Sequence, residues 1–250
     1  MALAGARALL DLIFPPRCVV CGASGADLCA VCAGKIRRPP APRCARCDTP
    51  LAGEIAAPGG LCRECVTGVL APALDRIIVA VVYEGPVRSA VHALKYYRKR
   101  RAALPLAGLA LAAWRASGLR ADVIVPVPLR RDRVRSRGYN QADLLAASVA
   151  RGAALPVRRD LLARVRDTAA QARLTASERR RNVVGAFGLR PGAAPALTGR
   201  TVLLLDDVVT TGATVQAAAS ALREARPTAI YALAVARPPL PSSDAPEPDL

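Results

Sequence analysis

The sequence predicts an α/β fold in which a mainly parallel sheet is flanked by helices and follows a small cysteine-rich module. Three apolar segments, 75–83, 121–125 and 201–205, have strand composition without polar alternation, which is typical of parallel strands covered on both faces. Apolar residues at helical spacing over 84–97, and an Ala- and Leu-rich stretch over 102–117, separate the first two strands. Strands that alternate with helices along a chain indicate a parallel sheet.

Composition divides the 250-residue chain into three parts. Residues 1–68 hold a short amphipathic N-terminal helix and the cysteine module, and residues 69–237 hold the α/β domain. Residues 238–250 form a Pro- and acid-rich tail with the composition of disordered chain. Asp11 interrupts the opening apolar run, and no small-residue cleavage site precedes the first cysteines. We therefore expect a cytoplasmic protein with no integral membrane segment.

The cysteines form four C-x-x-C pairs. Two thiolates separated by two residues hold one tetrahedral ion from a tight turn, and two such pairs complete a four-thiolate coordination shell. Four pairs predict two zinc ions, whose binding supplies most of the folding free energy of a module with few large apolar residues. Four thiolates leave no open position for water, so both sites are predicted to be structural. The predicted ligands are Cys18, Cys21, Cys29, Cys32, Cys44, Cys47, Cys62 and Cys65.

Alternatives to this assignment stay open at the level of sequence. An even number of cysteines also permits disulfides, although identical spacings and a reducing compartment favour zinc. Iron–sulfur ligation is a further alternative, because it uses sets of four cysteines as well. The pairing is open too. Sequential sites would join the first pair with the second and the third with the fourth, whereas crossed sites would join the first pair with the third.

The segment 201–214, TVLLLDDVVTTGAT, carries the sharpest chemical pattern. A buried strand ends in Asp206 and Asp207, at the sheet edge where α/β proteins bind ligands. Small residues follow, and they let the N-terminus of the next helix offer its N–H groups to a phosphate. The two acids suit sugar hydroxyls or a hydrated Mg²⁺ instead. The predicted phosphate loop comprises Thr210, Thr211, Gly212, Ala213 and Thr214.

A second anion site is predicted after the strand 121–125. Two prolines end that strand and fix a stiff loop at the same sheet edge. An arginine-rich stretch follows, and guanidinium groups suit a pyrophosphate because they donate paired hydrogen bonds and neutralise charge. The predicted pyrophosphate ligands are Pro128, Leu129, Arg130, Arg131 and Arg133.

The chain is strongly basic, with a formal net charge of +17; eight thiolates binding two Zn²⁺ would lower this charge by four, to +13. Such a field favours polyanions, but an arginine-rich solvated surface explains it equally well. The segment 95–101, KYYRKRR, allows two similar interpretations. It suits a nucleic-acid backbone with tyrosines that stack on bases, or a helix end whose cations complement the helix dipole.

These motifs resemble known proteins. The string from Val202 to Thr214 resembles the phosphoribosyl pyrophosphate (PRPP) motif of type I phosphoribosyltransferases. Together with the cysteine module, VPVPLRRDR, RGYNQ, RVRDTAAQARLTASERRRN and AFGLR, it is similar to the ComF family of competence-associated, phosphoribosyltransferase-like proteins, over about residues 10–237. The resemblance implies a type I phosphoribosyltransferase fold behind a double zinc ribbon, and PRPP bound with Mg²⁺. Arg130 is a departure, since a His often follows PVPL in this family.

The resemblance leaves two functional hypotheses. In the first, the protein is linked to DNA uptake during natural transformation and transfers a phosphoribosyl group from PRPP to an unknown acceptor. The acid pair would contact the ribose hydroxyls, and the polar segment 120–181 would close over the site. In the second, it is a non-catalytic competence factor for DNA uptake during natural transformation. It would bind single-stranded DNA, alone or with other competence proteins, and its PRPP pocket would be regulatory or silent.

Overall fold

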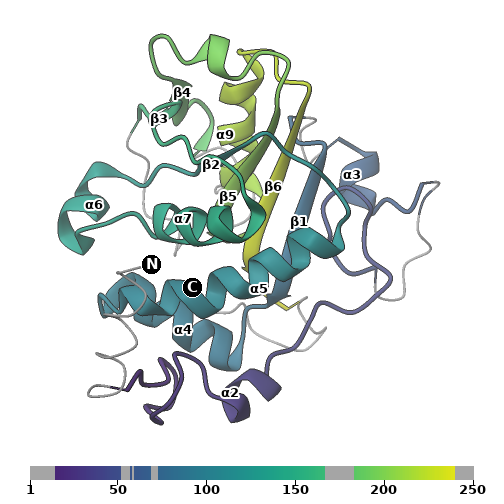
Figure 1. Cartoon of the computed structure of the whole chain (residues 1–250). Coiled ribbons are helices and arrows are strands. Elements are labelled where there is room, and N and C mark those ends of the chain that lie inside the picture. Colours follow the sequence, from purple (N-terminus) through teal and green to yellow (C-terminus); the bar gives the residue numbers. More distant parts are fainter. Residues whose placement is uncertain (1–14, 52–56, 58, 69–72, 167–182, 240–250) are drawn as a thin grey trace.

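Four parallel strands form the central sheet, in the order β1-β6-β5-β2. The computed structural model describes residues 15–51, 57, 59–68, 73–166 and 183–239. Strand β6 lies between β1 and β5, so the last strand described along the chain is inserted into the interior of the sheet (Figure 1). The predicted parallel α/β sheet is confirmed. Its strands are β1 (Arg76–Val82), β2 (Val123–Pro126), β5 (Thr201–Val208) and β6 (Ala229–Arg237).

Alternate residues of each strand supply two hydrophobic cores, because successive side chains of a strand point to opposite faces of the sheet. Val202 and Leu204 of β5 pack into one core, whereas Leu203 and Leu205 pack into the other. All four side chains are fully buried. Each contributes about 1.5–3 kcal/mol of transfer free energy, and coverage of both faces explains why this segment has no polar alternation.

Helices α4 (Gly85–Tyr96), α5 (Ala103–Ala116) and α7 (Gln141–Ala153) cover one face of the sheet (Figure 1). The other face is covered by α9 (Ala213–Arg223) and by an antiparallel pair of strands, β3 (Leu162–Arg164) and β4 (Phe187–Leu189). Short 3-10 turns, η1 (Arg100–Ala102) and η3 (Ala194–Ala196), complete the connections.

The cysteine module, with its short helices α2 (Ala30–Gly34) and α3 (Arg63–Val66), closes the outer edge of β1. Within β1, the N–H of Val82 donates to the carbonyl of Arg37 at 2.9 Å, and the N–H of Ile77 donates to the carbonyl of Arg46 at 2.7 Å. The N–H of Val79 donates to the buried carboxylate of Asp48 at 2.8 Å. An uncovered edge strand would expose these N–H groups to pairing with another chain. The module therefore completes the sheet as well as carrying the cysteines.

The structure differs from expectation in the arginine-rich stretch after PVPL, which forms helix α6 (Arg131–Arg137) where the sequence predicts a stiff loop. Gly138, in a left-handed conformation with φ of 81°, ends this helix. The loop that precedes α6 is accordingly short. Strands β3, β4 and β6 also have no counterpart among the predicted strands.

Three expectations concern segments outside the described residues: the N-terminal helix, residues 167–181 of the segment expected to close over the site, and the tail from residue 240. The described part of the segment 120–181 is largely regular structure, since it contains β2, α6, α7 and β3. In the ranges that the structure describes, no helix is both long enough and apolar enough to cross a membrane.

Candidate phosphoribosyl site and zinc centres

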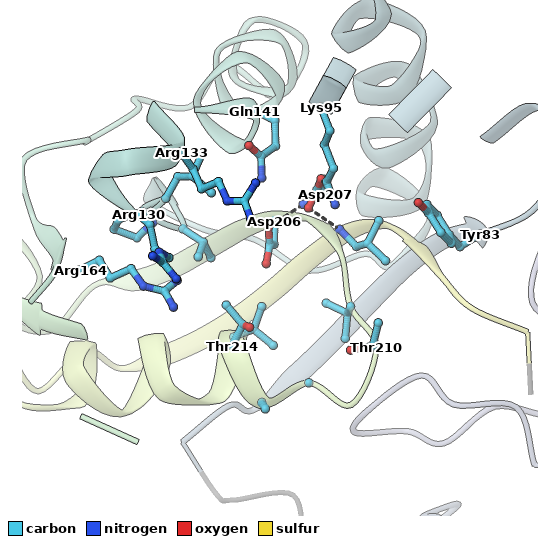
Figure 2. A pocket seen from close by; sticks show the side chains of 18 of the residues that line it. Tyr83, Lys95, Arg130, Arg133, Gln141, Arg164, Asp206, Asp207, Thr210 and Thr214 are labelled. Atoms are coloured by element: carbon cyan, nitrogen blue, oxygen red, sulfur yellow. Dashed lines mark hydrogen bonds and ion pairs between the residues drawn. The ribbon is translucent and has the colours of Figure 1, made fainter. Parts of the chain in front are cut away.

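A cavity of about 290 Å³ opens at the carboxyl edge of the sheet (Figure 2). Residues that directly follow β1, β2 and β5 line it, together with the last turns of α4 and the start of α9. This is the edge at which parallel α/β sheets bind ligands. Its lining consists of Tyr83, His92, Lys95, Tyr96, Val127, Pro128, Leu129, Arg130, Arg133, Arg137, Gln141, Arg164, Asp206, Asp207 and the residues from Val208 to Val215.

The acid pair, Asp206 and Asp207, is buried at the end of β5. Oδ1 of Asp206 accepts a hydrogen bond from the N–H of Asp207 at 2.8 Å, and Oδ1 of Asp207 accepts one from the N–H of Val208 at 2.9 Å. Burial, and after it the Asp207 carboxylate, raises the pKa of Asp206 well above its usual value. The pair is therefore stabilised by a nearby cation or by hydroxyl donors.

Lys95, in the last turn of α4, supplies such a cation. Its Nζ lies 2.8 Å from Oδ2 of Asp207, which makes no hydrogen bond of good geometry, so the contact is an ion pair. Figure 2 shows the Lys95 side chain extending from the helix toward the acid pair. Burial disfavours the charge of Lys95, but attraction to Asp207 outweighs burial and raises the pKa of Lys95. Lys95 is thus protonated at neutral pH.

All five residues of the predicted phosphate loop line the cavity. Helix α9 begins at Ala213, and Gly212 caps it with φ of 77°, a left-handed conformation that favours glycine. The hydroxyl oxygen of Thr211 lies 3.4 Å from the N–H of Ala213, which donates to it. N–H groups in the first turn of a helix have no partner within the helix, so this end of α9 is suited to a phosphate.

Arginines gather at one end of the cavity. Arg130 precedes α6, Arg133 lies in that helix, and Arg164 reaches the same end from β3 (Figure 2). Nε and Nη2 of Arg130 each donate to a carboxylate oxygen of Asp132 at 3.0 Å. The cavity lining includes four of the predicted pyrophosphate ligands, Pro128, Leu129, Arg130 and Arg133. The remaining one, Arg131, is exposed and lies outside the lining.

Aromatic rings form the wall next to Lys95. The rings of His92 and Tyr96 meet edge to face with centroids 5.2 Å apart, and the Arg137 guanidinium lies 5.8 Å from the Tyr96 centroid. Burial, and after it the charges of Arg88 and Lys95, lowers the pKa of His92. His92 is therefore neutral at pH 7, and its ring nitrogens can form hydrogen bonds beside the aromatic ring of Tyr96.

The cysteine sulfurs form two compact groups, in each of which the sulfurs lie within 4.8 Å of one another. The Sγ atoms of Cys21 and Cys29 are 3.6 Å apart, as are those of Cys47 and Cys62. Zinc–sulfur bonds of about 2.3 Å in a tetrahedron place sulfurs about 3.8 Å apart, so the donors and their spacing fit zinc. The ligand pairing is sequential, and not crossed. Site 1 is Cys18, Cys21, Cys29 and Cys32; site 2 is Cys44, Cys47, Cys62 and Cys65.

Backbone N–H groups prepare the Cys44 sulfur for metal. Burial opposes the thiolate of Cys44, but N–H donors from Cys47, Cys62 and Arg46 outweigh burial and lower the pKa of Cys44 to about 7. The N–H of Cys62 lies 3.3 Å from the Cys44 sulfur. A thiol that ionises near neutral pH binds Zn²⁺ with little proton-release cost.

Comparison with known proteins defines the family. Residues 9–68 match the double zinc ribbon domain, and residues 134–244 match the phosphoribosyl transferase domain. The chain is 36% identical over 193 residues to DNA utilization protein YhgH of Salmonella typhi, covering 75% of this chain and 80% of that protein. YhgH of Escherichia coli (strain K12) is 34% identical over an equal length. Competence protein F of Haemophilus influenzae is 40% identical over 103 residues, covering 41% of this chain and 44% of that protein.

The chain belongs to the ComF family. Its predicted fold class, a parallel sheet with flanking helices and a phosphoribosyltransferase domain behind a cysteine-rich zinc ribbon, is confirmed. A solved structure, the allosteric regulatory enzyme of purine biosynthesis, overlaps 54% of this chain and 26% of its own, with 18% identity and a TM-score of 0.37. That overlap is too partial to bear on function.

Several cavity residues of this ComF-family chain are absent from the predicted site. Gln141 and Arg164 fall in the RGYNQ and RVRDT motifs, which mark them as candidates without giving a role. Lys95 opens the basic segment 95–101, which the sequence assigns to a nucleic-acid backbone or a helix end and not to this cavity. Tyr83 and His92 fall in no motif, because they follow β1 or lie on α4, far along the chain from the acid pair. Their proximity to β5 follows from the strand order.

Proposed function

We propose that this ComF-family protein binds PRPP together with Mg²⁺ and transfers the phosphoribosyl group to an acceptor. The observation that carries the proposal is the grouping of the acid pair, the phosphate loop and the arginines around one cavity. PRPP has three chemically distinct parts, a 5′-phosphate, a ribose diol and a pyrophosphate. Each part has a counterpart in that lining.

The roles follow from the chemistry of each group. The loop from Thr210 to Thr214 would hold the 5′-phosphate at the start of α9, where N–H groups and the helix dipole favour an anion. The carboxylates of Asp206 and Asp207 would accept hydrogen bonds from the ribose hydroxyls. Arg130 and Arg133 would neutralise the pyrophosphate, with Arg164 a further donor at the same end of the cavity.

Mg²⁺ fits the acid pair chemically. It prefers carboxylate and water oxygens, and the buried Asp206 and Asp207 side chains at the end of β5 supply the carboxylate oxygens. When bound, the ion would supply charge neutralisation to the pyrophosphate. The residues that would hold it are Asp206 and Asp207.

Transfer would break the bond between ribose C1 and a pyrophosphate oxygen, and the electron pair of that bond would leave with pyrophosphate. A new bond would form between C1 and the nucleophilic atom of the acceptor, whose proton is released. Positive charge that develops on the sugar ring would be stabilised by the Asp206 and Asp207 carboxylates, and the arginines would stabilise the leaving group. Catalysis would therefore be mainly electrostatic.

Calorimetry with Mg·PRPP tests the proposal. We expect saturable binding to the zinc-loaded protein and a loss of at least about tenfold in affinity in the double variant Asp206→Asn/Asp207→Asn. The matched control is Asp160→Asn, whose carboxylate is exposed and paired with Arg158 at 2.8 Å. No heat at millimolar ligand with the wild-type protein would refute the proposal. Pyrophosphate release in the presence of candidate acceptors would separate transfer from binding alone.

A second candidate function is binding of single-stranded DNA. The names of the YhgH and competence relatives place those proteins in DNA utilization and competence, and we propose that this protein acts in the same context, in the cytoplasm. Specific support comes from Tyr96 and Tyr97, which are 58% and 71% exposed at the end of α4. Arg98 joins this end to α6 through a 2.8 Å hydrogen bond to the carbonyl of Ser136. Aromatic rings among cations are typical of single-strand binding surfaces.

Fluorescence anisotropy with labelled oligonucleotides across a salt series tests this second function. Phosphate contacts predict a linear fall of log K with log salt concentration. Tyr97→Ala should weaken binding by about 1–3 kcal/mol if the ring stacks on a base. The control is Arg63→Ala, since Arg63 is an exposed cation on α3, at the opposite side of the molecule from α6 (Figure 1). A flat salt response would remove this candidate.

A further inference from the structure

The RGYNQ motif, residues 137–141, joins the ends of three helices beside the cavity, and the proposed function gives its buried residues no role. Gly138 ends α6. The Tyr139 hydroxyl donates to the carbonyl of Leu94 in the last turn of α4, and Asn140 is the N-cap of α7. Both Tyr139 and Asn140 are buried. The motif therefore fixes α4, α6 and α7 relative to one another at the point where each contributes to the cavity lining.

The Asn140 side chain uses every polar group that it has. Its Oδ1 accepts a hydrogen bond from the N–H of Ala142 at 3.1 Å, which caps α7. Its Nδ2 donates to the carbonyl of Val127 at 2.9 Å and to Oδ1 of Asp143 at 3.3 Å. A carboxylate of the same size has no hydrogen to donate, and a hydroxyl has only one. Asn is therefore matched to this set of three partners in a way that Asp and Ser are not.

Val127 is the point at which the arginine-bearing loop leaves the sheet. Its N–H donates to the carbonyl of Leu205 at 2.9 Å, and its carbonyl accepts the amide hydrogen bond described above. The following residue, Pro128, has no N–H, and within the described ranges no backbone–backbone hydrogen bond holds Pro128 or Leu129. These two residues lead directly to Arg130, and all three line the cavity. The amide bond to Val127 therefore anchors the loop where its own backbone hydrogen bonding stops.

We propose that Asn140 is a positioning residue, which holds the loop 127–130 in the place where it receives the pyrophosphate of PRPP. This inference rests on the proposed function, in which Arg130 neutralises that pyrophosphate. Asn140 is not part of the cavity lining, so it acts through Val127 and not by touching the ligand. The ribose and 5′-phosphate contacts belong to β5 and the start of α9 instead. Loss of the anchor therefore weakens the pyrophosphate end of the site and spares the ribose 5-phosphate end.

Two substitutions remove the anchor and keep the helix cap. Asn140→Ser retains an oxygen that caps α7, but its short side chain cannot also donate to Val127. Asn140→Asp retains the shape and the cap, and it turns a carboxylate oxygen toward the Val127 carbonyl. For both variants we expect a loss of at least about tenfold in affinity for Mg·PRPP. The affinity for ribose 5-phosphate should stay within about twofold of wild type.

Calorimetry on the full-length, zinc-loaded protein measures both affinities, with Mg²⁺ present throughout. The matched control is Val149→Ala, because Val149 is fully buried in the core beneath the same helix, about two turns beyond Asn140. This change leaves a cavity and destabilises the protein without touching the loop anchor. Both affinities should therefore stay within about twofold of wild type in the control, and urea unfolding verifies that it is destabilised.

The outcomes separate the inference from the proposed function. Equal losses for the two ligands in the Asn140 variants would show a general structural role and overturn the inference, as would an unchanged affinity for Mg·PRPP. The proposed function stands in both cases if the wild type binds Mg·PRPP. Wild-type protein that does not bind Mg·PRPP overturns both. If Asn140→Ser fails to fold, Asn140→Asp decides, since it keeps both the shape and the cap.

Discussion

Arg237, the last residue of β6, is bonded to Cys47 of zinc site 2, since its Nη2 donates to the Cys47 carbonyl at 2.7 Å. The Arg237 side chain is buried and also contacts the hydroxyl of Thr49. Its own carbonyl accepts a hydrogen bond from the N–H of Tyr83 at 2.6 Å. One residue therefore joins the second zinc site to the wall of the cavity, and the ribbon and the sheet support each other.

Replacement of Arg237 by Ala should lower the free energy of unfolding by about 2–3 kcal/mol, because it removes charged hydrogen bonds and leaves the Cys47 carbonyl without its donor. Urea denaturation measures the change. Arg38→Ala is the control, since Arg38 is an exposed arginine of the same module, and it should stay within about 0.5 kcal/mol of wild type. Equal effects of the two variants would show that the Arg237 contacts contribute nothing specific.

Loss of site 2 should be more damaging than loss of site 1. All four ligands of site 2 are buried in a core shared with the sheet, whereas Cys21 of site 1 is exposed. The chain around site 2 also includes Arg46 and Asp48, which accept hydrogen bonds from backbone N–H groups at the edge of β1. We expect Cys65→Ser to lower the melting temperature by about 10 °C or more, and Cys21→Ser by a few degrees.

Metal analysis accompanies that comparison. The wild type should contain two Zn²⁺ per chain and each variant one, because the sulfur groups are separate. If both variants lose both ions, the sites fold as one unit, contrary to this expectation. If the melting temperatures fall equally, docking of site 2 on β1 has no added role.

Much of this architecture could be predicted locally. The unbroken apolar run before Asp206 predicts a strand covered on both faces, and the small residues after it predict that a helix follows, as α9 does. Four equal cysteine spacings predict two metal sites. They leave the pairing undecided, because that depends on how the connecting segments fold and not on the C-x-x-C turns.

Other features depend on tertiary structure and have no local signal. Lys95 enters the site because α4 packs into the core on one face of the sheet and its last turn lies beside the end of β5, an arrangement that depends on the strand order β1-β6-β5-β2. Asp48 is hidden in a polar turn of the cysteine module, yet it is buried because β1 needs a partner at its edge. The prolines before the arginine-rich stretch suggest a loop, but the arginines form the short helix α6, which ends at Gly138.

The phosphate loop depends on a glycine with positive φ, so Gly212→Ala should impair both stability and binding. A Cβ at φ of 77° costs about 1–2 kcal/mol, and relief of that strain would shift the N–H groups at the start of α9. We expect a lower free energy of unfolding and weaker PRPP binding in calorimetry.

Gly108→Ala is the matched control. Gly108 lies in the interior of α5, where a Cβ meets nothing within 4 Å, so this change should stabilise by about 0.5–1 kcal/mol. A stabilised Gly212→Ala with unchanged binding would contradict the assignment of the loop.

Stability should depend on pH through Asp206. Burial and the Asp207 carboxylate raise its pKa in the folded protein, so the native state binds the proton more tightly than the unfolded chain does. The stability that Asp206 contributes is full below its unfolded pKa of about 3.9 and is lost as pH rises through the higher folded value. Asp206→Asn has no such group, so its free energy of unfolding relative to wild type should increase from pH 5 to pH 8.

Urea unfolding at pH 5, 6, 7 and 8 measures this trend, and Asp160→Asn controls for it. Hydrogen bonds from Arg158 lower the pKa of Asp160 to about 2, so its contribution is present above the unfolded pKa and lost only as pH falls below it. The difference between Asp160→Asn and wild type should therefore stay constant over the same range. Any release of zinc at low pH affects all three proteins alike and cancels in the differences. Parallel curves for Asp206→Asn and wild type would mean that Asp206 is ionised in the folded protein throughout this range, contrary to the expectation.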